Sequence, residues 1–194
     1  MVVVSKFRPL ESLQEAYDAG ERIFAESRPL EFETKVKSLP EDIEWHFIGH
    51  LQTNKLRHVL PHVSLLQSLD SLHLADEIEK FCFKSSKTID ALLEIHVARE
   101  DTKHGIAPSE ARDAVKYITE NCPHIRLRGI MGMATNTDDE TVVNADFAAL
   151  KFLKDRLQEE FPALEELSMG MSSDYPIAIK NGTSIVRIGS AVFE

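Results

Sequence analysis

A lysine that follows a short apolar run is the residue whose position points most directly to chemistry. Lys6 comes directly after Val2-Val3-Val4-Ser5, and an Arg8-Pro9 pair stands just beyond it. An apolar, β-branched run of this kind is typical of a buried strand in a parallel sheet, and proline prevents the chain from continuing as sheet. Lys6 is therefore expected at the edge of an α/β sheet, where ligands collect. A partly desolvated amine in that place is suited to forming a Schiff base.

Two loops near the end of the sequence have the composition of a phosphate site. One reads Gly170-Met171-Ser172-Ser173-Asp174, and the other reads Arg187-Ile188-Gly189-Ser190. Glycine lets the backbone approach an anion, while serine hydroxyls, backbone amides and helix N-termini favour its binding. Each loop alone is a weak signal. Together they occupy the two places where a (β/α)8 barrel often binds phosphate, after its seventh and eighth strands.

A phosphate site beside an amine that can form an imine favours pyridoxal 5'-phosphate (PLP) as the cofactor. Arg187 lies two residues before Gly189, so it points to the same side of its strand and is expected to face the pyridine ring. An arginine stays protonated and would leave the ring nitrogen unprotonated, which weakens the ring as an electron sink. The alternatives are a salt-bridged or solvated arginine at position 187 and a surface lysine at position 6.

The elements that must position these residues alternate along the chain. Strands are predicted at 2–6, 22–26, 44–50, 63–70, 88–97, 125–133, 164–170 and 183–190, with helical segments at 10–20, 29–38, 53–60, 71–84, 108–121, 140–160 and 174–180. Eight strands joined by seven helical connectors predict a closed (β/α)8 TIM barrel with one outer helix missing. An open doubly wound sheet would accept the same alternation. The barrel is favoured because no GxGxxG follows the first strand and because eight parallel strands close around a filled interior.

Length and composition favour one soluble globular domain over residues 1–194. The chain is 43% hydrophobic and 28% charged, and its formal net charge is -10. That charge argues against binding to nucleic acids or to anionic membranes. The N-terminal apolar stretch is too short for a signal peptide, and no segment approaches the length of a membrane span. Cys82 and Cys122 lack metal-ligand spacing and are interpreted as reduced structural thiols of a cytoplasmic protein.

Two pairs of histidines have a spacing that can indicate metal binding on a helix. His46 and His50 are four residues apart, as are His58 and His62. The first pair falls on a predicted strand, where this spacing does not form a chelating turn, and no HExxH motif accompanies either pair. Structural or surface roles are therefore favoured for these histidines, and no metal site is predicted.

Seven segments spread from residue 2 to residue 193 resemble the YggS/PROSC family of pyridoxal-phosphate-binding proteins. They read VSKFRP, EAYDAGERIFAES, IEWHFIGHLQTNK, LLEIHVAREDTKHGI, LRGIMGMAT, LSMGMSSDY and VRIGSAVF. The resemblance implies a barrel of the alanine-racemase N-terminal-domain type that carries PLP covalently on Lys6. It also implies that Ser172, Gly189 and Ser190 hold the phosphate and that Arg187 faces the pyridine nitrogen.

The sequence departs from the family pattern in two places that affect the interpretation. Family members usually have a helix before the first strand, whereas this sequence begins at the strand, so the barrel is expected to lack that helix. The usual FGEN after the second strand reads Phe24-Ala25-Glu26-Ser27. An asparagine near the cofactor is thereby replaced, and Ser27 is not assigned to the site.

Two classes of function remain open at this point. The resemblance implies a protein of intracellular PLP homeostasis that holds PLP without robust catalysis and passes it to PLP-dependent apo-enzymes. A monomer is expected. The alternative is a PLP-dependent amino-acid racemase, which needs a base on each face of the substrate carbon. Of the three tyrosines only Tyr175 is expected near the site, and similarity of fold is weak evidence for activity. The binding role is favoured, and no catalytic residue is assigned.

Overall fold

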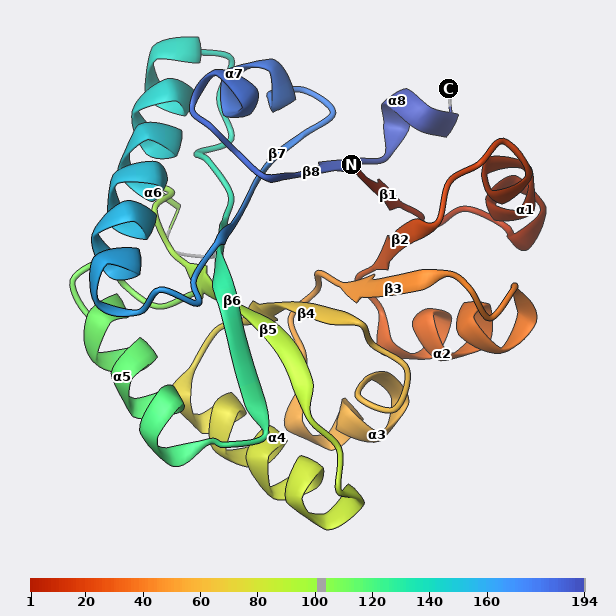
Figure 1. Cartoon of the computed structure of the whole chain (residues 1–194). Coiled ribbons are helices and arrows are strands. Elements are labelled where there is room, and N and C mark those ends of the chain that lie inside the picture. Colours follow the sequence, from red (N-terminus) through yellow and green to blue (C-terminus); the bar gives the residue numbers. More distant parts are fainter. Residues whose placement is uncertain (101–103, 194) are drawn as a thin grey trace.

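The chain folds into a closed parallel barrel surrounded by helices. The computed structural model describes residues 1–100 and 104–193. Eight strands pair in the order β1-β2-β3-β4-β5-β6-β7-β8, and β8 pairs with β1 to close the barrel. The helices lie on the outside of the strands (Figure 1). The prediction of a (β/α)8 TIM barrel is therefore confirmed.

The strands and helices follow one another in the predicted alternation. The strands are β1 (Val2–Val4), β2 (Ile23–Glu26), β3 (Glu44–Phe47), β4 (Leu65–Leu69), β5 (Ile89–Ile95), β6 (Ile125–Gly132), β7 (Glu166–Met171) and β8 (Ile185–Ile188). The helices are α1 (Leu10–Asp18), α2 (Pro29–Ser38), the 3-10 turn η1 (Thr53–Lys55), α3 (Leu56–Val59), α4 (Leu72–Ser85), α5 (Ala111–Asn121), α6 (Glu140–Glu160), α7 (Tyr175–Lys180) and α8 (Ser190–Phe193). No helix in these described stretches is long and apolar enough to cross a membrane.

The structure differs from the prediction mainly at the ends of elements. Most strands are shorter than predicted, and β1 ends at Val4 rather than at Lys6. A helix, α8, follows β8 where none was predicted, because its four residues are too few to produce a helical hydrophobic pattern. Residues 101–103, which belong to one of the segments quoted above, and residue 194 lie outside the described residues.

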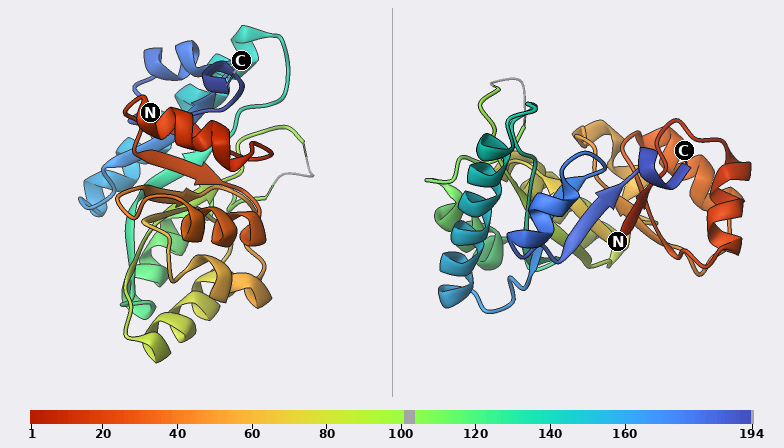
Figure 2. Two further views of the ribbon diagram at one scale, coloured as in Figure 1. Left: turned by 90° about the vertical axis from the view of Figure 1, so that its right-hand side faces the viewer. Right: turned by 90° about the horizontal axis from the view of Figure 1, so that it is seen from above.

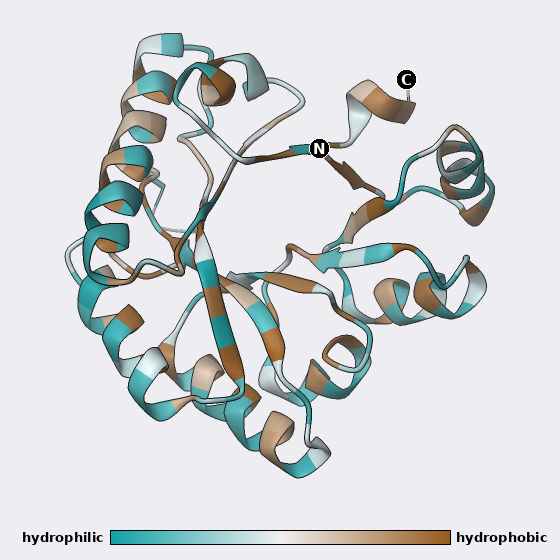
Figure 3. Ribbon diagram, viewed as in Figure 1, coloured by the Kyte–Doolittle hydropathy of each residue, from teal (hydrophilic) through white to brown (hydrophobic). Residues whose placement is uncertain are grey.

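The alternation of side chains along each strand separates two apolar regions. Val3 packs outward with Leu13 and Phe24 in the large core between the sheet and the helices. Val2 and Val4 point the other way and pack with Ala25 inside the barrel. Figure 3 shows β1 as continuously hydrophobic, whereas the outer helices carry both hydrophilic and hydrophobic residues. A strand buried on both faces is expected to be apolar throughout.

The interior of the barrel changes from apolar to polar along the strands. Leu65 and Ile185, the first residues of β4 and β8, belong to an apolar cluster inside the barrel. Two residues further along the same strands stand Gln67 and Arg187, both buried. The polar layer therefore lies closer to the carboxyl ends of the strands, the end at which barrel enzymes bind their ligands.

The two cysteines are buried in the outer core. Cys82 and Cys122 are free thiols, and burial raises the pKa of each to about 11. A buried thiol with a raised pKa carries little thiolate and is unreactive. This agrees with the structural role expected for both.

A glycine in β6 allows two neighbouring strands to approach closely. The register between β5 and β6 shifts after Ala91, so Leu92 pairs with Gly129. On its other side Gly129 pairs with Glu166 of β7. A methyl group at position 129 would lie 1.9 Å from the Glu166 carbonyl oxygen, which is less than van der Waals contact.

Replacement of Gly129 by alanine is expected to lower the free energy of unfolding by about 3 kcal/mol, because the new methyl group must push two paired strands apart. Urea denaturation monitored by circular dichroism measures the change. Gly20→Ala is the control, since Gly20 has a φ of 110° but open space around it. The control is expected to lose only about 1 to 2 kcal/mol from backbone strain. An equal loss in both variants would contradict the close approach of β6 and β7.

Candidate functional site

The residues assigned to the site from the sequence come from three neighbouring strands. Ser172 follows β7, Arg187 lies in β8, Gly189 and Ser190 follow β8, and Lys6 follows β1. Because β8 pairs in parallel with both β7 and β1, the carboxyl ends of these strands meet at the same end of the barrel. A methyl group at Gly189 would lie 3.3 Å from the Val4 carbonyl oxygen, so the end of β8 touches the end of β1.

Lys6 lies in a tight turn whose backbone is fixed. The Ser5 N–H donates to the Ala25 carbonyl oxygen at 2.9 Å, and the Arg8 N–H donates to the Ser5 carbonyl oxygen at 3.0 Å. Phe7 takes the left-handed conformation, with a φ of 64°, which costs on the order of 1 kcal/mol for a non-glycine residue. The side chain of Lys6 is exposed. The partial desolvation expected for its amine is therefore not observed, because the strand ends two residues earlier than predicted.

A buried ion pair supports the turn that carries Lys6. Glu26 and Lys35 are 0% and 6% exposed, and the Lys35 ammonium group donates to Glu26 Oε1. It also donates to the Ser5 carbonyl oxygen at 2.8 Å, and the Ser5 hydroxyl lies 3.0 Å from Glu26 Oε1. Helix α2 is thereby tied to the ends of β1 and β2. A buried ion pair whose remaining polar atoms are also hydrogen-bonded fixes one geometry.

The loops after β7 and β8 are joined by a hydrogen bond. The Gly189 N–H donates to the Ser172 hydroxyl at 3.2 Å. The β7–α7 loop is held from within, because the Met171 N–H donates to an Asp174 carboxylate oxygen at 2.6 Å. Helix α8 extends from Ser190 toward the start of α1 (Figure 2), where the Arg8 guanidinium lies 5.3 Å from the ring centre of Phe193. The two predicted phosphate loops therefore form one connected structure next to Lys6.

Arg187 is buried inside the barrel, where two hydrogen bonds fix its guanidinium. One is donated to the Ser168 hydroxyl at 2.7 Å and the other to the Gly132 carbonyl oxygen at 3.0 Å. Burial lowers the pKa of Arg187 to about 10. The group therefore remains protonated at neutral pH. The solvated arginine considered as an alternative is excluded, since only 3% of the residue is exposed.

A chain of hydrogen bonds leads from Arg187 across the barrel. The Ser168 hydroxyl donates to Gln67 Oε1 at 2.6 Å, and Gln67 Nε2 lies 2.8 Å from His46 Nδ1. Because the amide nitrogen is a donor, Nδ1 of His46 must accept. Burial lowers the pKa of His46 to about 4, so its ring is neutral. Arg187 thus provides the positive charge of this chain, and the other three residues orient it.

Glu94 of β5 is a buried carboxyl group that no motif in the sequence indicated. It is 4% exposed. Burial, together with the charge of Asp70, raises the pKa of Glu94 to about 7, although Arg187 and His50 act in the opposite direction. A carboxyl group that titrates near neutral pH is a functional-site candidate. Its position in a long apolar strand gave no sign of this in the sequence.

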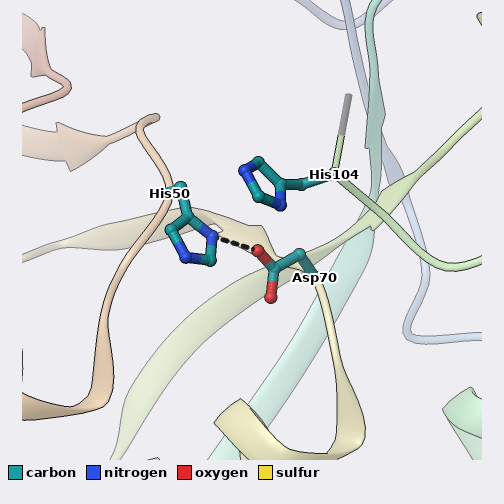
Figure 4. Close-up of side chains that lie close together, drawn as sticks. All are labelled: His50, Asp70 and His104. Carbon is teal, nitrogen blue, oxygen red and sulfur yellow. Dashed lines mark hydrogen bonds and ion pairs between the residues drawn. The ribbon is translucent and has the colours of Figure 1, made fainter. Parts of the chain in front are cut away.

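The histidine pairs seen in the sequence are separated by the fold. His46 points into the barrel, whereas His50 lies beyond the end of β3 and its Nδ1 contacts Asp70 Oδ2 at 2.6 Å. The ring of His104 stacks on the ring of His50 with 4.0 Å between their centres (Figure 4). In the second pair, Nδ1 of His58 contacts Glu33 at 2.5 Å. Among the described residues, His46, His50 and His58 therefore each contact a residue outside their own sequence pair.

Two further residues considered in the sequence lie near the site. Ser27 donates its N–H to Glu26 Oε2 at 3.1 Å, so it takes part in the supporting network. Tyr175 is the first residue of α7 and is 38% exposed. Its hydroxyl makes no hydrogen bond within the described residues, and nothing orients it as a base.

Comparisons with known proteins agree with this arrangement. A family model described as alanine racemase, N-terminal domain, matches residues 9–194. The pyridoxal phosphate homeostasis protein of Aquifex aeolicus is 41% identical over 191 residues, which cover 97% of this chain and 83% of that protein. The protein of the same name from Helicobacter pylori is 39% identical and is covered to 86% by the whole of this chain.

Solved structures give the same result. PipY of Synechococcus elongatus is 31% identical, and the match covers 100% of this chain and 92% of PipY. The TM-score is 0.94 for the structure without PLP and 0.89 for the structure with PLP bound. An alanine racemase of Clostridium difficile is similar in fold alone, with a TM-score of 0.82 at 14% identity over 98% of this chain and 51% of the racemase. The chain therefore belongs to the pyridoxal phosphate homeostasis family, which is built on the alanine racemase N-terminal-domain fold.

Proposed function

We propose that this protein binds PLP covalently through Lys6 and holds it for release, without robust catalysis of its own. The observation that carries the proposal is the contact between the ends of β7, β8 and β1. There the Gly189 N–H donates to the Ser172 hydroxyl at 3.2 Å. Gly189 also lies against the carbonyl oxygen of Val4, which precedes Lys6 by two residues. The relatives named for PLP homeostasis and the PLP-bound structure of PipY support the same cofactor.

The residues present fit this cofactor. When bound, PLP supplies an aldehyde that condenses with an amine and a phosphate that accepts hydrogen bonds. Lys6 supplies the amine on an exposed side chain that is free to reach the barrel mouth. The Ser172 hydroxyl and the Gly189 N–H now satisfy each other, and both become donors when an anion replaces that contact. Ser190, exposed and next in the chain, adds a third donor to the same group.

Arg187 supports a binding role rather than catalysis. Its guanidinium stays charged at neutral pH because its pKa is about 10, and Ser168 and Gly132 hold it in place. A permanent cation facing the pyridine nitrogen keeps that nitrogen unprotonated. The ring is then a poor electron sink, and carbanion chemistry is disfavoured.

No specific observation favours the racemase alternative. Racemisation needs a base on each face of the substrate carbon. Lys6 would serve one face, but Tyr175 is exposed and has no hydrogen-bond partner among the described residues to orient it.

We extend the proposal to a cytoplasmic monomer, with PLP-dependent apo-enzymes as the recipients. The net charge of -10 argues against a nucleic acid as the partner.

Mixing the protein with PLP is expected to give a visible absorption band and, after reduction with borohydride, a covalent label on Lys6. Peptide mass mapping identifies the labelled residue. Lys6→Ala is expected to abolish the label while the phosphate contacts leave weak, reversible binding. Lys37→Ala, which removes an exposed lysine of α2, is the control and should be labelled as wild type is. A reducible label that persists in Lys6→Ala would refute the proposed site.

Ser172→Ala is expected to weaken PLP binding by about 10- to 150-fold, since a hydrogen bond to a charged group contributes about 1.5 to 3 kcal/mol. Fluorescence titration measures the dissociation constant. Ser173→Ala is the matched control, because Ser173 is the next residue in the same loop and its side chain is exposed. Equal affinities of the two variants would mean that the phosphate lies elsewhere.

The Glu94 carboxylate and the Arg187 guanidinium attract each other inside the barrel. Titration of Glu94 should change the stability of the folded protein with pH. The folded pKa of about 7 lies above the ordinary value of 4.5, so the folded protein holds a proton that the unfolded chain releases between these pH values. Stability should therefore fall as pH rises from 4.5 to 7. At 1.36 kcal/mol for each pKa unit, the total loss is about 3 kcal/mol.

Glu94→Gln is expected to remove this loss, so it should match wild type near pH 4.5 and be more stable at pH 8 by about 3 kcal/mol. Urea unfolding at several pH values gives the comparison. Glu11→Gln, on the exposed surface of α1, is the control and should leave the pH dependence unchanged. A Glu94→Gln effect of the same size at every pH would contradict the raised pKa.

A further inference from the structure

Three potential metal ligands from separate segments meet at the mouth of the barrel. His50 follows β3, Asp70 follows β4, and His104 belongs to the segment between β5 and α5. Each offers one ligand atom, and these atoms all lie within 4.8 Å of one another. Figure 4 shows the two imidazoles facing each other beside the carboxylate. The local spacing of histidines did not predict this group, because its members are brought together by neighbouring strands.

The three residues divide into one fixed ligand and two movable ones. The side chain of Asp70 is 6% exposed, whereas that of His50 is 45% exposed, and His104 is also exposed. Asp70 accepts a hydrogen bond from Nδ1 of His50 at 2.6 Å. Within the described residues the ring of His104 makes no hydrogen bond, and its contact with His50 is the stacking of the two rings.

Stability of the fold alone is a weak explanation for this arrangement. An ion pair with an exposed histidine contributes at most about 1 kcal/mol. The stacking of the two imidazoles is also lost when both rings are protonated, because like charges repel when the ring centres are 4.0 Å apart. A divalent cation would instead satisfy the buried carboxylate and both rings at once.

We propose that His50, Asp70 and His104 bind a divalent transition-metal ion of the zinc type. Two imidazoles and one carboxylate are borderline ligands that suit Zn²⁺ or Co²⁺ rather than Mg²⁺ or Ca²⁺. Ligands about 2.1 Å from a tetrahedral ion are about 3.4 Å apart. The His50–Asp70 contact must therefore open slightly, while rotation of the exposed rings brings His104 inward. In the metal complex Nδ1 of His50 carries no proton, so the imidazole binds as the neutral ring that is protonated at Nε2.

The proposed metal lies at the same end of the barrel as Lys6 but on another wall. Its ligands follow β3, β4 and β5, whereas the PLP residues follow β7, β8 and β1. Three protein ligands leave one position of a tetrahedral ion open to water or to a small ligand. The site therefore does not depend on the proposed PLP function, and it can be tested in protein without PLP.

The test uses Co²⁺ as the probe, because its visible absorption reports nitrogen and oxygen ligands in a site of low coordination number. Titration of the whole chain is expected to give one bound ion, which an equivalent of Zn²⁺ displaces. His50→Gln and His104→Gln should each weaken binding by at least about 100-fold, since loss of an outer-shell partner alone costs up to this much. Both residues are exposed, so neither variant is expected to disturb folding.

His124→Gln is the matched control. Nδ1 of His124 lies 2.6 Å from Glu79, so this variant breaks a similar histidine–carboxylate contact far from the mouth. It should bind Co²⁺ as wild type does. The proposal is overturned if wild type shows no stoichiometric binding, if His104→Gln binds as tightly as wild type, or if His124→Gln loses binding to the same extent.

Discussion

The pairing of the last strand with the first is the interaction on which the rest of the structure depends. β8 and β1 share two residue pairs, Val2 with Arg187 and Val3 with Ile188. This pairing leaves the sheet without an exposed edge and sets Gly189 against the Val4 carbonyl group. Because both strands are short, the loops that follow them begin almost at once and lie side by side. The proposed PLP site is therefore a consequence of barrel closure.

Barrel closure also determines the electrostatics of the interior. It surrounds Arg187 with protein, and a buried cation is tolerated only when hydrogen bonds replace its water. Ser168 and the Gly132 carbonyl group provide these hydrogen bonds, and Gln67 and His46 hold Ser168 in turn. His46 has to be neutral for this chain to form, and its pKa of about 4 meets that condition. One positive charge is thus held at a fixed place near the ligand end of the barrel.

The sequence was sufficient to predict the barrel and the three strands that carry the proposed site. Strand and helix patterns are local, and Lys6, Ser172 and Gly189 all follow strand ends that a parallel barrel brings to one end. Contacts across the barrel were not predictable in the same way. Ser168 and Gln67 are 101 residues apart, and their contact depends on register and strand tilt, which no local pattern encodes. For the same reason, local spacing paired His50 with His46, whereas the fold pairs it with Asp70 and His104.

The exposure of Lys6 and the positive charge of Arg187 both support the proposed role of a PLP carrier. An enzyme that stabilises a carbanion gains from a protonated ring nitrogen and from a site closed to water. Here the lysine side chain is exposed on a fixed turn, so water or a free amine can reach it, and in the proposed site the arginine cation would oppose protonation of the ring. A carrier needs both properties, because it must release its cofactor to an incoming amine without performing chemistry on that amine. Exposure of the lysine, unexpected from the sequence, therefore strengthens the case for a protein that holds and releases PLP.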